Sequence, residues 1–312
     1  MELFKRQTHI DFMGRRRTAI VLSGVLLLLS LASFGVRGLN FGIDFTGGTL
    51  VEVGYPQATE LEPVRSALSD AGFGDAIVQH FGTTQDVLIR LAPEAELSKA
   101  ELSTRIFRAL QQASGGDVDL RRVEFVGPQV GEELTEKGGL AMLIALGAIL
   151  IYVALRFEYR FAVGSVSALA HDVLITIGFF SVTQMEFDLT VLAAVLAVIG
   201  YSLNDTIVVF DRIRENFRKM RKGTAEAVVN TSINQTLSRT LMTSGTTLIV
   251  LVVLFLLGGE LIHSFSTALI VGVVVGTYSS IYVASTAALA LGVSKADLMP
   301  VKKEGAEVDA RP

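Results

Sequence analysis

Residues 200–216 read GYSLNDTIVVFDRIREN, and they close an apolar run that is otherwise compatible with lipid. This segment places Asn204 and Asp205 near the end of an expected membrane helix. A carboxylate inside a spanning segment costs ~3 kcal/mol on insertion scales, so such residues usually serve ion or proton movement within a helical bundle. The segment therefore predicts a membrane protein with a polar site inside its bundle.

The rest of the chain has the composition of a membrane protein that crosses the bilayer several times. Half of its 312 residues are hydrophobic, and the mean hydropathy is +0.51. The apolar residues gather in runs at 18–36, 138–155, 161–182, 189–210, 240–257 and 265–291. Each run is near the roughly 20 residues that a helix needs to cross hydrocarbon. The sequence therefore predicts six spans.

The basic residues of the short loops predict the orientation. Lys and Arg precede the first run, separate the second from the third, and separate the fourth from the fifth, whereas 183–188 and 258–261 contain neither. Basic loops stay on the cytoplasmic side, so we expect both termini to be cytoplasmic. The first run could alternatively belong to a cleavable signal peptide. That alternative would leave five spans with mismatched loop charges.

The residues between the first two spans have a soluble composition and read strand, helix, strand, strand, helix, strand. We expect strands near 49–55, 76–81, 86–91 and 119–126, and helices near 60–71 and 98–114. The predicted fold is an all-α six-helix membrane bundle with an α+β, ferredoxin-like periplasmic domain inserted between helices 1 and 2. With no cysteine in the chain, this domain has no disulfide and must be stabilised by packing.

These patterns divide the chain into five parts. They are a cytoplasmic basic leader (1–17), the first membrane helix (18–36), the periplasmic domain with its junctions (37–137), membrane helices two to six (138–293) and a cytoplasmic tail (294–312). The tail is polar and carries charges of both signs, which is typical of disorder.

Two glycine-rich junctions flank the periplasmic domain. The first, LNFGIDFTGGT at 39–49, contains Gly42, Asp44, Gly47 and Gly48; the second, VGPQVGEE at 126–133, contains Gly127 and Pro128. A phosphate-binding loop is one interpretation of the first junction, but it lacks a lysine and a following helix N-terminus. We expect both to be structural connections, at which glycine allows unusual backbone geometry and proline ends the last strand.

Together, the two junctions, Ala-His-Asp at 170–172 and the segment 200–216 resemble the SecF-like members of the SecD/SecF family. The resemblance implies half of a bundle of the resistance-nodulation-division type in the bacterial inner membrane. It also implies pairing with SecD, association with the SecYEG channel, and use of proton-motive force to help exported unfolded polypeptides leave the membrane on the periplasmic side. It implies no enzyme activity, cofactor, metal or nucleic acid, and the partner half is expected on a separate polypeptide.

Asp205 is the candidate proton carrier. Tyr201 and Ser202 precede it by one turn on the same helix face and could donate hydrogen bonds to it. Burial would disfavour its charged form and a nearby cation would favour it. The alternative is a carboxylate that reaches toward the inner headgroups, because Asp211 and Arg212 follow closely.

Arg239 is the second candidate of the proton pathway. Gln235, Arg239 and Thr243 recur every fourth residue and Thr246 continues the stripe, which indicates a polar face turned into the bundle. By resemblance, Arg239 matches the functional arginine of this span, where its permanent charge would act electrostatically. The alternative is an ordinary cytoplasmic anchor. Pairing of Asp205 with Arg239 within this chain or across to SecD is left open.

Three further residues are candidates for the polar interior. His171 and Asp172 lie halfway along the third span, where they could join the proton pathway or form a structural hydrogen-bonded pair. Asn204 could also join the proton pathway, or it could form a hydrogen bond to a neighbouring helix.

In the sixth span, small residues recur every fourth position and predict a ridge for close helix packing. They are Gly272, Gly276, Ser280, Ala284 and Ala288.

Three other functions fit parts of the sequence. Half of a proton-driven small-molecule exporter would use the same bundle, but exporters of that class carry much larger outer domains. An intramembrane aspartyl protease would need Asp172 and Asp205 to share a proton, and the Gly-x-Gly-Asp context of such proteases is missing. A passive scaffold that only holds SecD would not need Asp205 to titrate.

Overall fold

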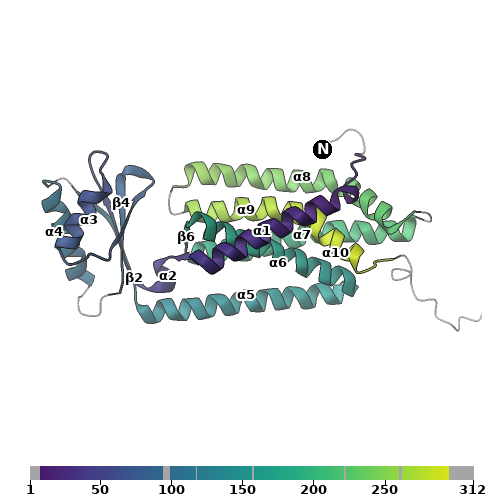
Figure 1. The fold of residues 1–312 in the computed structure, drawn as a ribbon, viewed down its shortest axis with the longest axis horizontal. Helices are drawn as coiled ribbons and strands as arrows, with labels where there is room; N and C mark the ends of the chain where they lie inside the picture. The colour runs from purple at the N-terminus through teal and green to yellow at the C-terminus, as the bar shows by residue number, and fades with distance from the viewer. Residues whose placement is uncertain are drawn as a thin grey trace, which may run out of the picture.

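The computed structural model describes residues 8–93, 99–116, 118–156, 158–220, 223–259 and 262–294. Within these residues, six helices are long and apolar enough to cross a membrane. They lie side by side in an elongated bundle, and a small sheet with two helices stands at one end (Figure 1). We call this end the sheet end and the opposite one the basic end.

The spanning helices follow the order of the chain. They are α1 (Arg16–Arg37), preceded by the 3-10 turn η1 (Met13–Arg15), α5 (Pro128–Arg156), α6 (Tyr159–Thr183), α7 (Leu189–Lys219), α8 (Ala225–Leu257), and a sixth span made of α9 (His263–Ser279), the π-helical turn η3 (Ser280–Ala284) and α10 (Ser285–Ala290). The expected six spans are therefore present.

Several helices continue well beyond the apolar runs. α8 begins at Ala225, where the Thr224 side chain accepts a hydrogen bond from the Ala227 N–H, although the fifth run begins only at residue 240. α5 begins at Pro128, before the second run at residue 138. Hydropathy marks the part of a helix that is compatible with lipid, whereas capping and backbone hydrogen bonds decide where the helix ends.

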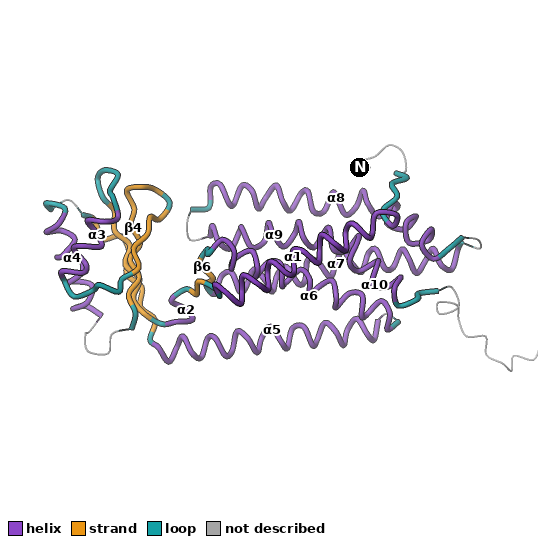
Figure 2. The backbone as a smooth tube through the Cα atoms, viewed as in Figure 1, coloured by secondary structure: helices purple, strands orange, loops and turns teal. Residues whose placement is uncertain are grey.

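The sheet contains β2 (Gly48–Gly54), β3 (Ile77–Phe81), β4 (Thr83–Leu91) and β5 (Asp119–Val126) in the order β3-β4-β2-β5. All its neighbouring strands are antiparallel. Helices α3 (Leu61–Asp70) and α4 (Lys99–Ala113) lie on the side away from the bundle, as Figure 2 shows. The strands and helices agree closely with those expected from periodicity.

The two faces of the sheet have different partners because strand side chains alternate. Val51, Val53 and Ile89 pack with Leu68 and Ile106 of the two helices to form the core of this domain. Leu50 and Leu88 point to the opposite face, where Ile43 completes a smaller cluster. The second face looks toward the bundle.

Three short elements connect the sheet to the bundle. β1 (Asn40–Phe41) pairs in parallel with β6 (Glu186–Phe187), which lies between α6 and α7. The one-turn helix α2 (Ile43–Thr46) follows β1 and packs against α5. Elements of two to four residues have no detectable periodicity, so the sequence did not predict them.

Candidate functional site

Asp205 lies inside the bundle, with 7% of its surface exposed. Thr240 of α8 donates a hydrogen bond to Oδ1 at 2.7 Å, and Ser280 of η3 donates one to Oδ2 at 2.5 Å. Each carboxyl oxygen therefore has its own hydroxyl partner on a different neighbouring helix. The side chain therefore points into the bundle and not toward the inner headgroups, which was the alternative that the sequence left open.

The partners of Asp205 differ from those expected. Tyr201 donates to Ser244 Oγ at 3.1 Å, and Ser202 donates to Asp172 Oδ2 at 2.5 Å. The expectation was wrong because residues one turn away on the same helix compete with hydroxyls that adjoining helices bring closer. Which helices adjoin α7 is a property of the fold and not of the local spacing.

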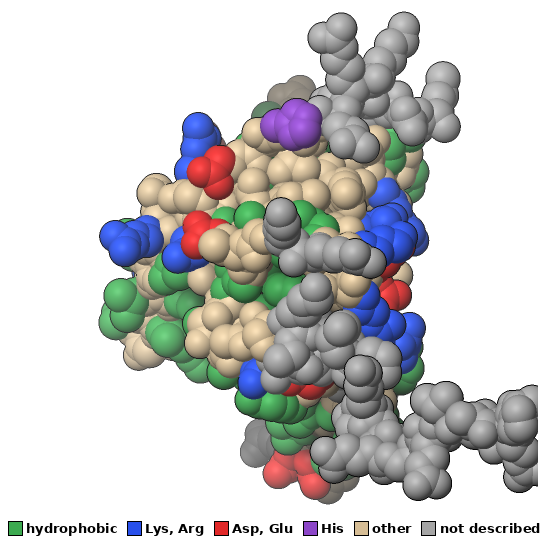
Figure 3. Space-filling view, turned by 90° about the vertical axis from the view of Figure 1, so that its right-hand side faces the viewer, with side chains coloured by type: hydrophobic (Ala, Val, Ile, Leu, Met, Phe, Trp, Pro, Cys, Tyr) green, Lys and Arg blue, Asp and Glu red, His purple; other side chains and the backbone are tan. Residues whose placement is uncertain are grey.

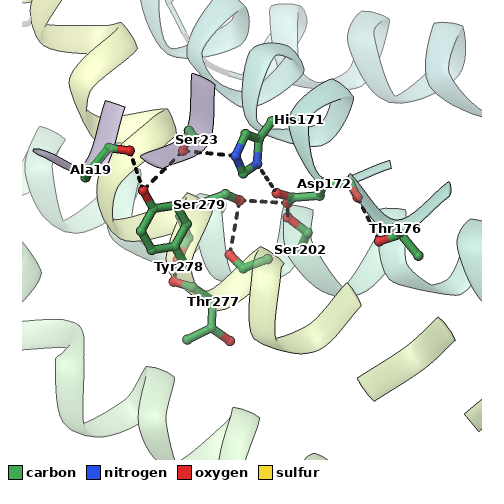
Figure 4. Close-up of polar contacts among 11 residues, drawn as sticks. Ala19, Ser23, His171, Asp172, Thr176, Ser202, Thr277, Tyr278 and Ser279 are labelled. Atoms are coloured by element: carbon green, nitrogen blue, oxygen red, sulfur yellow. Dashed lines mark hydrogen bonds and ion pairs between the residues drawn. The ribbon is translucent and has the colours of Figure 1, made fainter. Parts of the chain in front are cut away.

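Asp172 of α6 is the centre of a second buried cluster, drawn in Figure 4. Its Oδ1 is 2.8 Å from His171 Nδ1, while Ser202 and Ser279 both donate to its Oδ2, at 2.5 and 2.7 Å. His171 Nε2 lies 3.1 Å from Ser23 Oγ of α1. Asp172 is 1% exposed and His171 4%. The cluster joins α1, α6, α7 and α9 through charged or polar groups only.

The two carboxyl clusters adjoin each other without merging. Ser279 belongs to the Asp172 cluster and Ser280 to the Asp205 cluster. Within the described residues, no hydrogen bond joins the two carboxyl groups. The π-helical turn begins at Ser280, and such turns inside α-helices occur frequently at functional sites. A shift of this turn would affect both clusters.

Arg239 lies on the exposed face of α8. No ion pair joins it to Asp205 within the part of the chain that the structure describes, although it directly precedes Thr240, a hydroxyl donor to Asp205. Thr243 and Thr246 are exposed as well, so the stripe expected to face inward faces out of this bundle. The prediction of an inward face was wrong because a polar stripe on a helix can equally mark an outer surface that a polar partner covers.

A hollow of about 1060 Å³ lies beside Arg239 at the basic end. Asn204 is exposed into this hollow and takes no part in either carboxyl cluster. The lining also includes Arg156, Asp211, Arg212, Gln235 and Thr236. Figure 3 views the molecule from this end, where Lys and Arg side chains stand in groups at both edges of the face.

The packing ridge of the sixth span lies against α7. A Cβ atom added to Gly272 would stand 2.1 Å from Val198 Cγ2, and one added to Gly276 would stand 3.1 Å from Ser202 Cβ. Ser280 continues this ridge and contributes its hydroxyl to Asp205. The glycines thus allow the approach that brings the hydroxyl within reach.

The first junction connects the sheet to α7. Gly42 precedes α2, and the Asp44 carboxylate accepts a hydrogen bond at 2.9 Å from the N–H of Leu189, the first residue of α7. Gly47 and Gly48 have φ of 69° and 129°, and a Cβ on Gly48 would stand 2.3 Å from the carbonyl oxygen of Leu91. Only glycine fits such positions without strain.

The second junction begins α5. The Gly127 carbonyl accepts hydrogen bonds from the N–H groups of Val130 and Gly131, and Pro128 is the first residue of the helix, where proline is favourable. A Cβ on Gly131 would lie 2.8 Å from the backbone nitrogen of Gly47. The two junctions are therefore in backbone contact with each other.

An ion pair that the sequence did not predict also links the sheet to the bundle. Arg90 of β4 lies 2.7 Å from Glu186 of β6, and its guanidinium also donates to the Phe41 carbonyl at 3.0 Å. Burial raises the pKa of Glu186, Arg90 lowers it, and the nearby Asp188 and Asp44 raise it further. In the sequence, Arg90 is an ordinary alternating residue of a strand, so no signal marks this contact.

Among the described residues, no group of three or more His, Asp or Glu side chains could hold a metal ion. The polar groups of the bundle include carboxyl, imidazole and hydroxyl groups, which can bind or pass protons, and guanidinium groups, which keep their charge.

Known proteins resemble the chain along nearly its whole length. The family profile of the protein export membrane protein SecD/SecF, C-terminal, matches residues 106–294, and that of the SecD/SecF GG motif matches residues 32–58. The protein translocase subunit SecF of Vibrio alginolyticus is 55% identical over 100% of this chain and 99% of the relative. The SecF of Pseudomonas aeruginosa is 50% identical over 97% and 98%.

Solved structures are similar as well. The crystal structure of SecDF from Thermus thermophilus, described as a translocon-associated membrane protein, has a TM-score of 0.84 at 40% identity. It matches 93% of this chain, which spans only 39% of the SecDF chain. SecDF in a super-membrane-facing form has a TM-score of 0.70 at 39% identity, with the same coverage. The chain therefore belongs to the SecD/SecF family of protein-export membrane proteins.

Proposed function

We propose that this subunit of the Sec translocase works with SecD and uses proton-motive force to promote protein export. One observation carries the proposal: the Asp205 carboxyl is buried among membrane helices, with one hydroxyl donor on each oxygen. A carboxylate in such surroundings is costly and is kept for ion or proton movement. Asp205 is the proposed proton carrier.

Protonation of Asp205 would change the contacts among three helices. As a carboxylate, Asp205 accepts a hydrogen bond from Thr240 on one oxygen and from Ser280 on the other. When one oxygen is protonated, it becomes a donor, and the hydroxyl that faces it must reorient. The two hydroxyls belong to α8 and η3, so their reorientation shifts these elements against α7. Coupling requires two arrangements that bind the proton differently. The unequal similarity to two SecDF structures at almost the same identity supports more than one arrangement in the family.

The exposed face of α8 would meet the SecD half. Arg239 and Asn204 line the same open hollow, and their polar surface faces out of this chain. A polar face at membrane depth needs a protein or water neighbour. We assign Arg239 an electrostatic role at this boundary, because its charge is permanent and it directly precedes Thr240, which donates to Asp205.

The sheet domain would move with α7. The Asp44 carboxylate accepts a hydrogen bond from the first residue of α7, α2 packs on α5, and Arg90 binds Glu186 of β6. These contacts connect the sheet to the beginning of α7, the helix that carries Asp205. His171 and Asp172 extend the polar interior to α1.

The location follows from charge and topology. The basic end carries the loops rich in Lys and Arg, which favours a cytoplasmic position for it and for both termini. The sheet domain would then be periplasmic in the bacterial inner membrane. Its strand–helix order and the sheet order β3-β4-β2-β5 support the ferredoxin-like class. The boundaries expected from the sequence, 37–137 for this domain and 138–293 for helices two to six, belong to the same proposal.

The role is non-enzymatic. A protease would need Asp172 and Asp205 to share a proton, whereas each carboxyl has its own hydroxyl partners. The proposed further partners are the SecYEG channel and exported unfolded polypeptides. The small core of the sheet domain disfavours a drug exporter.

Export of a reporter protein in cells tests this proposal. Asp205→Asn and Arg239→Met should each reduce export while SecD still co-purifies with the chain. Glu136→Gln, an acid-to-amide change at an exposed site, is the matched control and should export normally. Normal export by both site variants, with SecD bound, would leave only a scaffold role.

A further inference from the structure

A groove on the side of the bundle has neither Asp205 nor Arg239 in its lining. It lies between α1, α6 and the sixth span, and its volume is about 480 Å³, within the ~300–1,000 Å³ of small-molecule sites. Its lining is mainly apolar and includes Ala19, Gly24, Leu27, Leu174, Val283 and Ala287.

The groove begins near the basic end and runs toward the middle of the bundle. Ala19 lies one turn after the start of α1 at Arg16, and Leu27 lies eight residues further along, about 12 Å at 1.5 Å per residue. Ile20, which lines the groove, is 52% exposed, and Leu28, on the outer surface of α1, is 68% exposed. The groove therefore opens on a surface that faces hydrocarbon.

Two arginines give the end of the groove near the basic end of the bundle a positive charge. Arg15 and Arg17 are exposed, and no ion pair holds either of them within the part of the chain that the structure describes. Arg15 lies one turn before Ala19, which lines the groove together with Tyr282. An anionic group bound by these arginines would lie at the depth of lipid headgroups, where basic residues attract phosphate.

The other end of the groove, near the middle of the bundle, adjoins the Asp172 cluster. Ser23 and His171 both line it and are hydrogen-bonded to each other, as Figure 4 shows. An apolar cavity does not hold water well, and an empty one loses dispersion contacts along its walls. An alkyl chain would restore these contacts and separate the polar cluster from the bilayer.

We propose that the groove binds an anionic phospholipid, with its phosphate at Arg15 and Arg17 and one acyl chain between α1 and the sixth span. The apolar lining selects the tail and the arginines select the headgroup. The bound chain closes the hydrocarbon side of the Ser23–His171 contact.

Tryptophan fluorescence tests this proposal, because the chain contains no tryptophan. The full chain with Leu174→Trp is reconstituted in phosphatidylcholine vesicles that contain increasing fractions of brominated phosphatidylglycerol or brominated phosphatidylcholine. Brominated phosphatidylglycerol should quench this groove reporter at a several-fold lower fraction. Leu28→Trp, on the outer surface of α1, should be quenched equally by both lipids.

Two further changes separate binding in the groove from general lipid contact. Gly24→Leu adds volume where no atom lies within 4 Å of the new Cβ, so it fills the groove and should abolish the preference. Gly35→Leu adds the same volume at an equally open site of α1 outside the groove and should preserve it. Arg15→Gln with Arg17→Gln should reduce the preference to that of phosphatidylcholine. Equal quenching of Leu174→Trp by both lipids, or a preference that survives Gly24→Leu, would overturn the proposal.

Discussion

Ser279 and Ser280 are adjacent in the sixth span, yet they donate hydrogen bonds to two different buried carboxyl groups. Ser279 binds Asp172 at 2.7 Å, and Ser280 binds Asp205 at 2.5 Å. Neighbouring residues of an ordinary α-helix point in directions about 100° apart, and here α6 and α7 meet the helix on these two sides. One short segment therefore forms hydrogen bonds to both buried carboxyl groups.

This arrangement predicts different effects for two adjacent serines. Ser280→Ala removes a donor from Asp205 and should lower the part of export that depends on proton-motive force. Ser279→Ala removes one of three partners of Asp172 and should affect that part much less. Hydrogen bonds to charged groups contribute ~1.5–3 kcal/mol, so both variants should lose comparable stability. Export with and without an uncoupler, at matched protein levels, measures the difference; equal losses would contradict it.

The ridge of the sixth span predicts a local cost for added volume. Gly272→Val would force a side chain into Val198, which lies 2.1 Å from the new Cβ, and overpacking of this kind costs about 1–3 kcal/mol. Gly245→Val adds the same group where no atom lies within 4 Å. Thermal unfolding of the purified protein should show a lower midpoint for the first variant only. An unchanged midpoint for Gly272→Val would show that the helices do not pack this closely.

The Arg90–Glu186 pair predicts a pH-dependent contact between sheet and bundle. Burial raises the pKa of Glu186 above its ordinary 4.5, so the folded chain binds this proton more readily than the unfolded chain. The stabilising contribution of this group is therefore present at low pH and is lost as the pH rises through the raised value. Arg90→Gln should cost about 1–3 kcal/mol at neutral pH, because it leaves a carboxylate with 22% exposure unpaired.

Glu186→Gln provides the control for that prediction. It removes the charge and should be tolerated at neutral pH, and the double variant with Arg90→Gln should recover most of the loss. Unfolding measured from pH 4 to pH 8 should show that the Arg90→Gln defect shrinks at the acidic end. A defect of constant size, or a double variant that is as unstable as Arg90→Gln alone, would contradict this electrostatic account.

The spans and the sheet could be predicted because they have regular periodicity. Apolar runs mark the six helices, and strand alternation separates residues such as Leu50 and Val51 onto the two faces of the sheet. The one-turn α2 and the two-residue β1–β6 pair are too short to have a period. Their positions depend on contacts between segments that are about 145 residues apart, such as Asp44 with Leu189.

The site could be predicted in part. A carboxylate in an apolar run is conspicuous in the sequence, and Asp205 is indeed buried. Its partners could not be found by spacing, because Thr240 and Ser280 are ordinary helix residues until the fold brings them to α7. Arg239 shows the reverse: its stripe was visible, but whether it faces this bundle or another surface depends on how the helices are arranged.

Transport of a reporter protein into inverted membrane vesicles, with the complex of this chain and SecD present, tests the central proposal most directly. The rate is compared with and without an imposed proton gradient for the native chain, Asp205→Asn and Glu136→Gln. We expect the gradient to accelerate transport for the native chain and the exposed-site control but not for Asp205→Asn. An equal acceleration in all three, with SecD bound throughout, would contradict a proton-carrying role for Asp205.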